Sequence, residues 1–151
     1  TTKELEAFFN KATAIVNEEI ANTLSYLGEQ CVARIRDRSA EESWVDHTGN
    51  LRSSIGYAVF NNGAKIAESS FETILGGSIG SATGRRYVDS LASQYAQTYS
   101  LVVVAGMSYA DYVEAINNKD VLASTELWAR AEIQKYLDKA KEKAIRRINA
   151  L

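Results

Sequence analysis

Two residues of this 151-residue chain could together perform nucleophilic chemistry: its only thiol, Cys31, and its only histidine, His47. A histidine beside a cysteine can act as the base that generates a thiolate. Cys31, however, falls within a predicted helix, on the same apolar stripe as Leu24, Leu27 and Ile35. A free cysteine in that setting is typically a small buried hydrophobe. We therefore predict a structural role for Cys31 and no catalytic Cys–His pair.

A glycine-rich run at residues 76–84, followed by Arg85 and Arg86, is the second place where chemistry could occur. Glycine loops that open a helix can hold phosphate through backbone N–H groups. The P-loop pattern requires a lysine at this point, whereas arginines follow here. The composition instead favours a mobile surface loop, which would order only on assembly. A zinc site built on cysteines is excluded, because such a site needs several thiolates and the chain has one. We predict no catalytic, cofactor-binding or metal site.

The overall composition is that of one ordinary folded domain covering residues 1–151. Hydrophobic residues make up 46% of the chain and charged residues 24%, as in typical globular proteins. The formal net charge of -2 argues against a general nucleic-acid binder, and sequence-specific nucleic-acid binding is not expected. No apolar run approaches the roughly 20 residues that cross a bilayer, and no signal peptide is visible. We expect no membrane association and synthesis in a reducing cytoplasm.

Apolar residues that recur every three or four positions predict a long helix at each end of the chain. The N-terminal helix covers residues 1–38 and the C-terminal helix residues 125–151. Either Thr1 or Thr2 can cap the first helix. That helix would be about 50 Å long, which exceeds the width of a small domain, so part of it should pack on something else. Gly28 leaves two possibilities open, one continuous rod or two helices that meet at the glycine.

The region between the helices, residues 51–123, changes to a period of two and predicts a sheet with an inserted helix. A half-buried strand should begin near Leu51, followed by a tight turn at residues 61–63. The further predicted elements are a strand at residues 64–75, a short helix at residues 85–97 with Tyr87, Leu91 and Tyr95 on one face, a buried strand at residues 100–105, a short helix at residues 109–116 and an edge strand at residues 119–123. The fold class is therefore α+β, with long N- and C-terminal helices packed on a small, mainly antiparallel sheet that carries one inserted short helix.

The stretch at residues 46–55, with the sequence DHTGNLRSSI, is the most distinctive in the chain. Gly49 permits a tight backbone turn. The polar residues able to bond neighbouring amides and hold that turn are Asp46, Thr48 and Asn50. Leu51 and Ile55 should point into a core, and Arg52 should be free to project outward. By residue types alone, this segment is a loop that enters a strand.

A second segment later in the chain, taken together with this stretch, forms a recognisable pattern. The matching positions of the first segment are Asp46, Thr48, Gly49, Leu51, Arg52, Ser54 and Ile55, and those of the second are Tyr109, Ala110, Tyr112, Val113 and Glu114. In this order, with a strand just before the second segment, they resemble the neck or tail-completion proteins of long-tailed phages, also described as minor tail or head–tail joining proteins. The resemblance spans about residues 34 to 130.

The chain departs from the family pattern in two places. Residues 115–118, which follow Glu114, replace a glycine-containing turn and an arginine–proline–phenylalanine type segment, and the chain contains no proline. Residues 76–97 look like an insertion relative to compact members of the family.

The resemblance implies a structural phage or prophage protein without catalysis and without a cofactor. Such a protein completes the tail and joins it to the head as one subunit of a ring. Its expected location is the virion neck or tail, and its expected partners are further copies of itself and the tail tube, tail terminator or head connector proteins. Within the two segments, Arg52 and Glu114 should serve joining, and Leu51 and Tyr112 should serve folding.

Two other functions remain open on the sequence. One is a soluble bacterial interaction module that dimerises through its long helices, and the other is a small hydrolase. Neighbouring genes for a portal, a large terminase or a tail tube protein would separate the phage protein from both.

Overall fold

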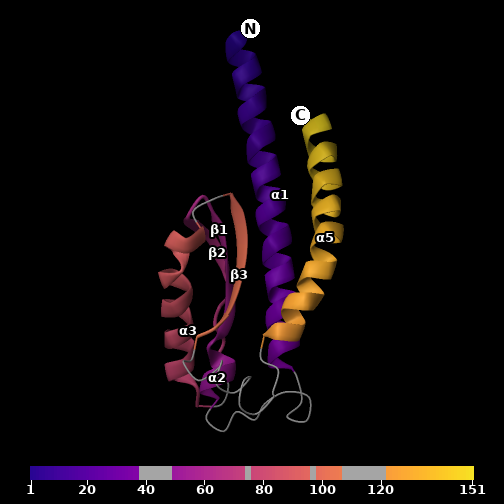
Figure 1. Cartoon of the computed structure of the whole chain (residues 1–151). Coiled ribbons are helices and arrows are strands. Elements are labelled where there is room, and N and C mark those ends of the chain that lie inside the picture. Colours follow the sequence, from indigo (N-terminus) through magenta and orange to yellow (C-terminus); the bar gives the residue numbers. More distant parts are fainter. Residues whose placement is uncertain (38–48, 74–75, 96–97, 107–121) are drawn as a thin grey trace.

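A computed structural model describes residues 1–37, 49–73, 76–95, 98–106 and 122–151. Its elements, in chain order, are α1 (Thr2–Arg36), α2 (Asn50–Ser53), β1 (Ile55–Asn61), β2 (Ala64–Glu68), α3 (Ser78–Ser90), the 3₁₀ helix η1 (Ala92–Tyr95), β3 (Tyr99–Ala105) and α5 (Ala123–Asn149). The three strands form one antiparallel sheet, with α1 and α5 on one side and α3 on the other (Figure 1). The predicted α+β class, with long terminal helices on a small antiparallel sheet, is confirmed.

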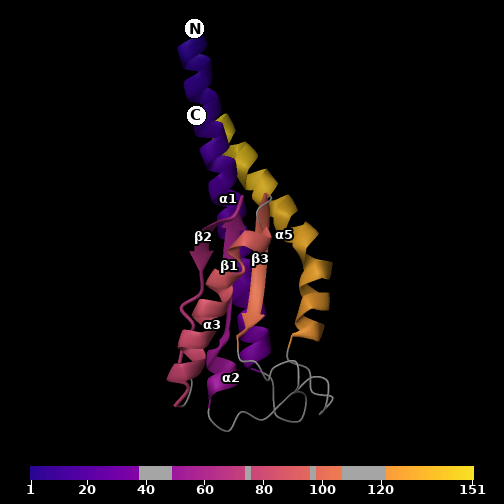
Figure 2. The ribbon, with the colours of Figure 1, turned by 60° about the vertical axis from the view of Figure 1, so that its left-hand side comes forward.

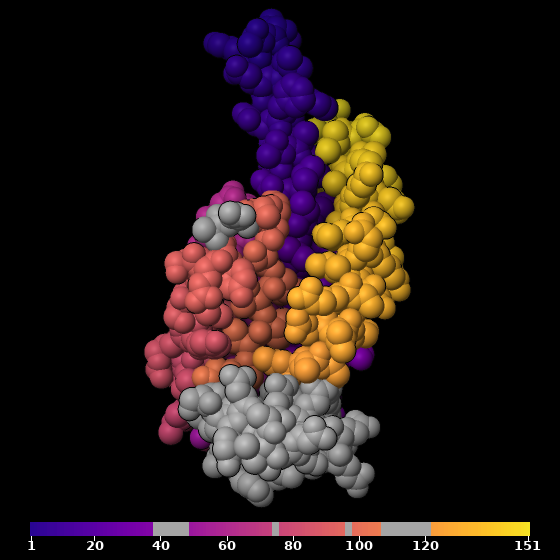
Figure 3. Space-filling view, viewed as in Figure 1, coloured from indigo at the N-terminus to yellow at the C-terminus, as the bar shows by residue number. Residues whose placement is uncertain are grey.

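Helix α1 is one continuous rod. The side chain of Thr1 accepts a hydrogen bond from the backbone N–H of Glu4, and the Glu4 carboxylate bonds back to Thr1, which forms a capping box. The helix runs through Gly28 without a break, so the continuous rod is the correct alternative. Gly28 serves close packing instead, because a Cβ at this position would lie 2.6 Å from Cγ of Tyr57. The first turns of α1 extend beyond the rest of the molecule in both ribbon views and in the space-filling view (Figures 1, 2 and 3).

The sheet has the order β2-β1-β3. The turn between β1 and β2 is confirmed, because Asn62 and Gly63 have φ angles of 53° and 84°, the left-handed pair that a two-residue hairpin requires. The ladder shifts register between Val59 and Phe60, which marks a bulge. Strand β2 ends at Glu68 rather than at residue 75. Beyond it, Phe71 has a φ of 50° and buries its ring beneath α3, so the chain leaves the sheet there.

The prediction of a half-buried strand was wrong in two respects. Strand β1 begins at Ile55, because Leu51 belongs to the short helix α2. Both faces of β1 are buried, since α1 covers one face and α3 the other. One core includes Tyr57 and Val59 between the sheet and α1, and a second includes Phe60 between the sheet and α3.

The prediction of a loop at residues 76–84 was also wrong. Helix α3 begins at Ser78 and includes most of the glycine run, so the inserted helix starts seven residues earlier than predicted and ends at Ser90. The predicted apolar face was wrong in part, because Tyr87 is exposed whereas Val88 is fully buried. The physical reason for the helix is the close approach of Gly80 and Gly84 to the backbone of the segment that leads into β1.

Helix α5 runs antiparallel to α1 and packs along it (Figure 1). Three contacts mark the pairing: Glu19 with Arg147, the ring of Tyr26 with that of Tyr136, and Arg34 over the ring of Trp128. The helix begins at Ala123, two residues before the predicted start, so the last residue of the predicted edge strand is helical. Leu122 is the N-cap of α5, and residues 119–121 and the predicted helix at residues 109–116 lie outside the described residues.

Candidate assembly interface

The described part of the first segment, residues 49–55, contains a short helix that starts at a glycine. Gly49 has a φ of 80° and forms the N-cap of α2, a backbone conformation that a larger side chain would strain. Ser54 closes the helix by donating its side-chain O–H to the carbonyl of Leu51 at 2.7 Å. Leu51 and Ile55 are both buried, as predicted. This segment, which we call the corner (residues 49–55), is fixed in place and aims the chain into β1.

Helix α3 contacts the corner through its glycines. Gly77, Gly80 and Gly84 recur at helical spacing, so they share one face. A Cβ at Gly80 would lie 1.9 Å from the carbonyl oxygen of Asn50, and a Cβ at Gly84 would lie 2.4 Å from that of Ser54. The backbone N–H of Gly80 also donates to the Asn50 side chain at 3.0 Å. The glycine run therefore forms a smooth helix face that lets α3 approach the motif backbone closely. It does not form a phosphate loop.

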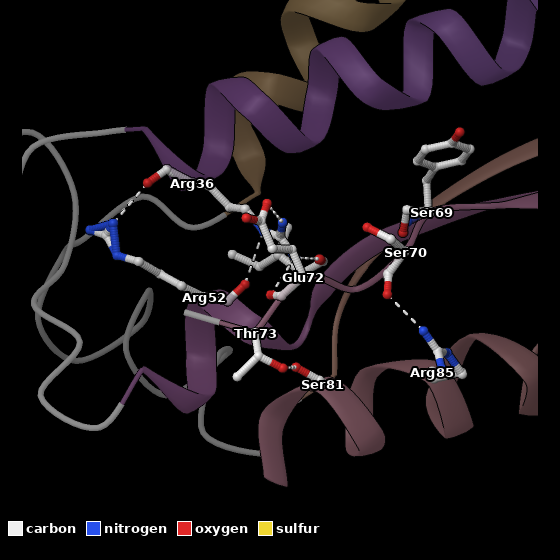
Figure 4. A network of polar contacts seen from close by, with 10 residues as sticks. Arg36, Arg52, Ser69, Ser70, Glu72, Thr73, Ser81 and Arg85 are labelled. Carbon is white, nitrogen blue, oxygen red and sulfur yellow. Dashed lines mark hydrogen bonds and ion pairs between the residues drawn. The ribbon is translucent and has the colours of Figure 1, made fainter. Parts of the chain in front are cut away.

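Two arginines join the corner to the end of α1 (Figure 4). Arg52 donates to the backbone carbonyl of Arg36 at 2.7 Å, and Arg36 donates to the carbonyls of Arg52 at 3.2 Å and Ile55 at 2.8 Å. The expectation that Arg52 is free to project outward was wrong, since it is half-buried and bonded to α1. Burial lowers the pKa of the Arg36 guanidinium, and the nearby carboxylate of Glu72 opposes that shift. These arginines satisfy carbonyl groups at a helix end, where the backbone has no partners of its own.

The segment after β2 is tied to the same corner from the other side (Figure 4). The carbonyl of Glu72 accepts a bond from Arg36 at 3.3 Å, and the hydroxyls of Thr73 and Ser81 lie 2.7 Å apart. Arg85 of α3 donates to the carbonyl of Ser70 at 2.6 Å. Arg36 thus bonds both the corner and the segment after β2, and that segment is also joined to α3 through Ser81 and Arg85.

The sequence analysis did not identify Arg36 as a residue that bonds to the first segment. Its only signal was a basic last turn, which many helices share. Of the predicted site residues, Gly49, Leu51, Arg52 and Ser54 lie together in the corner. Gly106, which ends the described part of the chain before the second segment, donates to the carbonyl of Ser54 at 3.1 Å. The other predicted residues, Asp46, Thr48, Tyr109, Tyr112 and Glu114, lie outside the described residues, as does His47.

The opposite end of α1 presents a different surface. Residues 1–11 are all exposed in the described part of the molecule. Among them, Leu5, Phe8 and Phe9 are 55%, 42% and 58% exposed, and the two rings contact each other edge to face. Figure 3 shows these turns standing clear of the domain body. Neighbouring apolar residues exposed on one helix segment are typical of a contact surface.

A cavity of about 600 Å³ lies between α1, β3 and the first turns of α5. Its wall includes Leu27, Cys31, Leu101 and Ile133, and the ion pair of Glu126 with Arg130 also lines it. Cys31 is buried, as predicted, and burial raises the pKa of its thiol. A neutral, buried thiol is a poor nucleophile.

Within the described ranges, no three His, Cys, Asp or Glu side chains gather as metal ligands, and no helix is both long and apolar enough to span a membrane. Comparison with known proteins adds no relative: the chain matches no family model, no curated protein and no solved structure.

Proposed function

We propose that this chain is a structural subunit of the neck or tail end of a long-tailed phage or prophage. It completes the tail and joins it to the head as part of a ring, and its work is done by interface burial rather than by catalysis. Its partners are other copies of itself and the tail tube, tail terminator or head connector proteins. Its location is the virion, after synthesis in the cytoplasm of the bacterial host.

The observation that carries this proposal is the pair of sequence segments that resemble the tail-completion family. The described part of the first segment supports it, because Gly49, Leu51 and Ser54 form a fixed corner whose backbone is bonded from α1 and packed against α3. Such a corner suits a subunit that must present its neighbouring residues in a constant geometry. The exposed apolar turns of α1 support it as well, since a joining protein needs surface that another chain can bury.

Deletion of the gene from the phage or prophage that carries it tests the proposal directly. We expect electron microscopy of the resulting particles to show separate heads and tails, and plaque counts to fall sharply. Expression of the wild-type chain from a plasmid should restore both. Normal joined particles and normal plaque counts after deletion would overturn the assignment.

The variant Arg52→Ala sharpens the test. Arg52 donates to the carbonyl of Arg36, so its removal should cost about 1–2 kcal/mol of stability for a lost part-buried hydrogen bond. The matched control is Arg130→Ala, which removes an exposed arginine from α5. We expect both variants to fold and only Arg52→Ala to rescue the deletion poorly. Equal rescue by the two would remove Arg52 from the joining function.

The alternative function, a bacterial interaction module that dimerises through its long helices, is favoured by the same exposed turns of α1. The genes beside this one separate the two possibilities. A portal, a large terminase or a tail tube gene in the neighbourhood supports the phage protein, and their absence supports the interaction module.

A further inference from the structure

We infer that the exposed turns of α1 pair antiparallel with the same turns of a second copy of this chain. The pairing concerns the purified, free protein, and it does not depend on the assignment to a phage neck. The surface consists of residues 2–12, which we call the projecting segment.

The apolar stripe of the projecting segment continues a stripe that is already covered inside the molecule. Leu5, Phe8 and Ala12 follow one another at helical spacing, and the same line continues to Ile15 and Glu19. The last two are buried at 9% and 4% exposure. The line is therefore covered where α5 lies beside it and uncovered farther along. A helix segment of this length is marginal in water without a packed face.

The covered part of the stripe shows which orientation it accepts. Helix α5 lies antiparallel on it, and Arg147 donates to Glu19 at 2.7 Å. Because the helices are antiparallel and Tyr26 lies beside Tyr136 and Arg34 beside Trp128, Asn149, the last residue of α5, lies near the level of Thr13. The turns beyond that level leave room for a second antiparallel helix. A second copy of the projecting segment continues the line of α5 in the same direction.

The charges of the segment select its own copy as that partner. When two copies of a helix pair antiparallel along such a stripe, the residues on one side of the stripe face the residues on the same side of the partner's stripe. Glu4 and Lys11 lie on the same flank, seven residues apart. The register that sets Leu5 on the partner's Phe8 also sets Glu4 beside the partner's Lys11, and the two-fold axis repeats each contact. The segment is thus complementary to itself in both apolar contacts and charge.

The contact is small, so the dimer should be weak and dependent on concentration. Stable interfaces bury about 1,200–2,000 Å², and two segments of about three turns bury less. Sedimentation velocity over a range of protein concentrations should show a reversible monomer–dimer equilibrium. A strict monomer throughout that range would overturn the inference, whether or not the chain binds another tail protein through the same residues.

Charge reversal tests the register. A homodimer of the Glu4→Lys variant sets two ammonium groups against each other at each pair, and a homodimer of the Lys11→Glu variant sets two carboxylates against each other. We expect each variant alone to dimerise about 10-fold more weakly than the wild type at low ionic strength.

A mixture of the two charge variants supplies the control. In this register the heterodimer forms an opposite-charge pair at both contacts, because one copy carries lysine and the other carries glutamate at positions 4 and 11, so the mixture should dimerise more tightly than either variant alone. The double variant, with Glu4→Lys and Lys11→Glu in one chain, restores both ion pairs with their signs exchanged. The Glu4→Lys change also removes the capping box at Thr1, so we expect the double variant to dimerise more tightly than either single variant but not more tightly than the wild type, measured by sedimentation velocity at the same ionic strength. A double variant as weak as the single ones, with a wild type that does dimerise, would overturn the register.

The variant Phe8→Glu tests the apolar contact. It should weaken self-association by about 100-fold or more, because it removes a buried ring from each copy and buries charge in its place. The matched control is Leu127→Glu, since Leu127 is also an exposed helical residue but lies on α5, at 71% exposure. Both variants should melt like the wild type at concentrations where the protein is monomeric. Equal dimerisation by Phe8→Glu and the wild type would place the contact elsewhere.

Discussion

The two ends of α1 belong to one unbroken helix but have opposite surroundings. At the C-terminal end, Ile35 is fully buried and Arg36 bonds to three backbone carbonyls of other segments. At the N-terminal end, Leu5 and Phe9 are more than half exposed. The comparison shows that helical periodicity reports the existence of an apolar face and not what covers it. At one end the domain itself covers the face, and at the other end the domain leaves it uncovered.

This contrast predicts that substitutions near the corner lower the stability of the isolated protein and that substitutions in the projecting segment do not. The largest effect is expected for Leu51→Ala. Leu51 is 2% exposed, within the core formed by α1 and the sheet. Its truncation should cost about 2–5 kcal/mol of unfolding free energy through lost burial and the cavity left behind. Urea denaturation measures this cost. Leu127→Ala is the control, and equal losses at both positions would contradict the contrast.

Gly80→Ala should have the next largest effect, and its sign is the informative part. Helix propensity alone would make alanine stabilising by about 1 kcal/mol inside a helix. The Cβ, however, would meet the carbonyl oxygen of Asn50 at 1.9 Å, so we expect a loss of about 1–3 kcal/mol from overpacking. Gly76→Ala provides the control because nothing lies within 4 Å of its Cβ position. A stabilised Gly80→Ala protein would show that α3 does not pack on the corner as described.

Tyr57 should make the stability of the protein depend on alkaline pH. Burial, with the nearby carboxylate of Glu29 as the next cause, raises the pKa of Tyr57 from 10.0 to about 12. The neutral phenol is therefore favoured by folding, and its contribution is complete below pH 10 and lost as the pH rises toward 12. Over that window, the wild type should lose about 2 kcal/mol more stability than Tyr57→Phe. Chemical denaturation at several pH values measures the difference.

A second tyrosine controls for general alkaline effects. Tyr87 is 45% exposed on α3, and Tyr87→Phe is the control variant that removes a phenol from the surface instead of from the core. If Tyr57→Phe and the wild type lose stability in parallel between pH 10 and 12, folding does not raise the pKa of Tyr57.

The smallest effect on stability is expected for Phe9→Ala. The ring is 58% exposed and lies beyond the part of α1 that packs on the domain, so truncation should change the unfolding free energy by no more than about 0.5 kcal/mol. Phe60→Ala is the contrasting variant, because Phe60 is fully buried against η1 and α3. Thermal melts of dilute protein compare the two. A large loss in Phe9→Ala would mean that the projecting segment is part of the folding unit.

The sequence by itself determined the local elements that depend on near neighbours in the chain. The periodic apolar positions specified both terminal helices, Asn62 and Gly63 specified the hairpin turn, and the run LVVV at residues 101–104 specified β3. The Thr1 and Glu4 capping box is equally local. Of the motif, the burial of Leu51 and Ile55 followed from their residue types. These features need only the preferences of adjacent residues, which any single sequence contains.

Only the tertiary structure decided what the glycines and arginines of the corner do. A run rich in glycine costs helical stability and is typical of a loop, yet Gly80 and Gly84 are helical because their missing side chains let α3 reach the motif backbone. Arg36 was an ordinary basic residue of a helix end until the fold brought three carbonyl groups to it. In each case the free energy comes from groups distant in the sequence, and local preference carries no information about contacts that only folding creates.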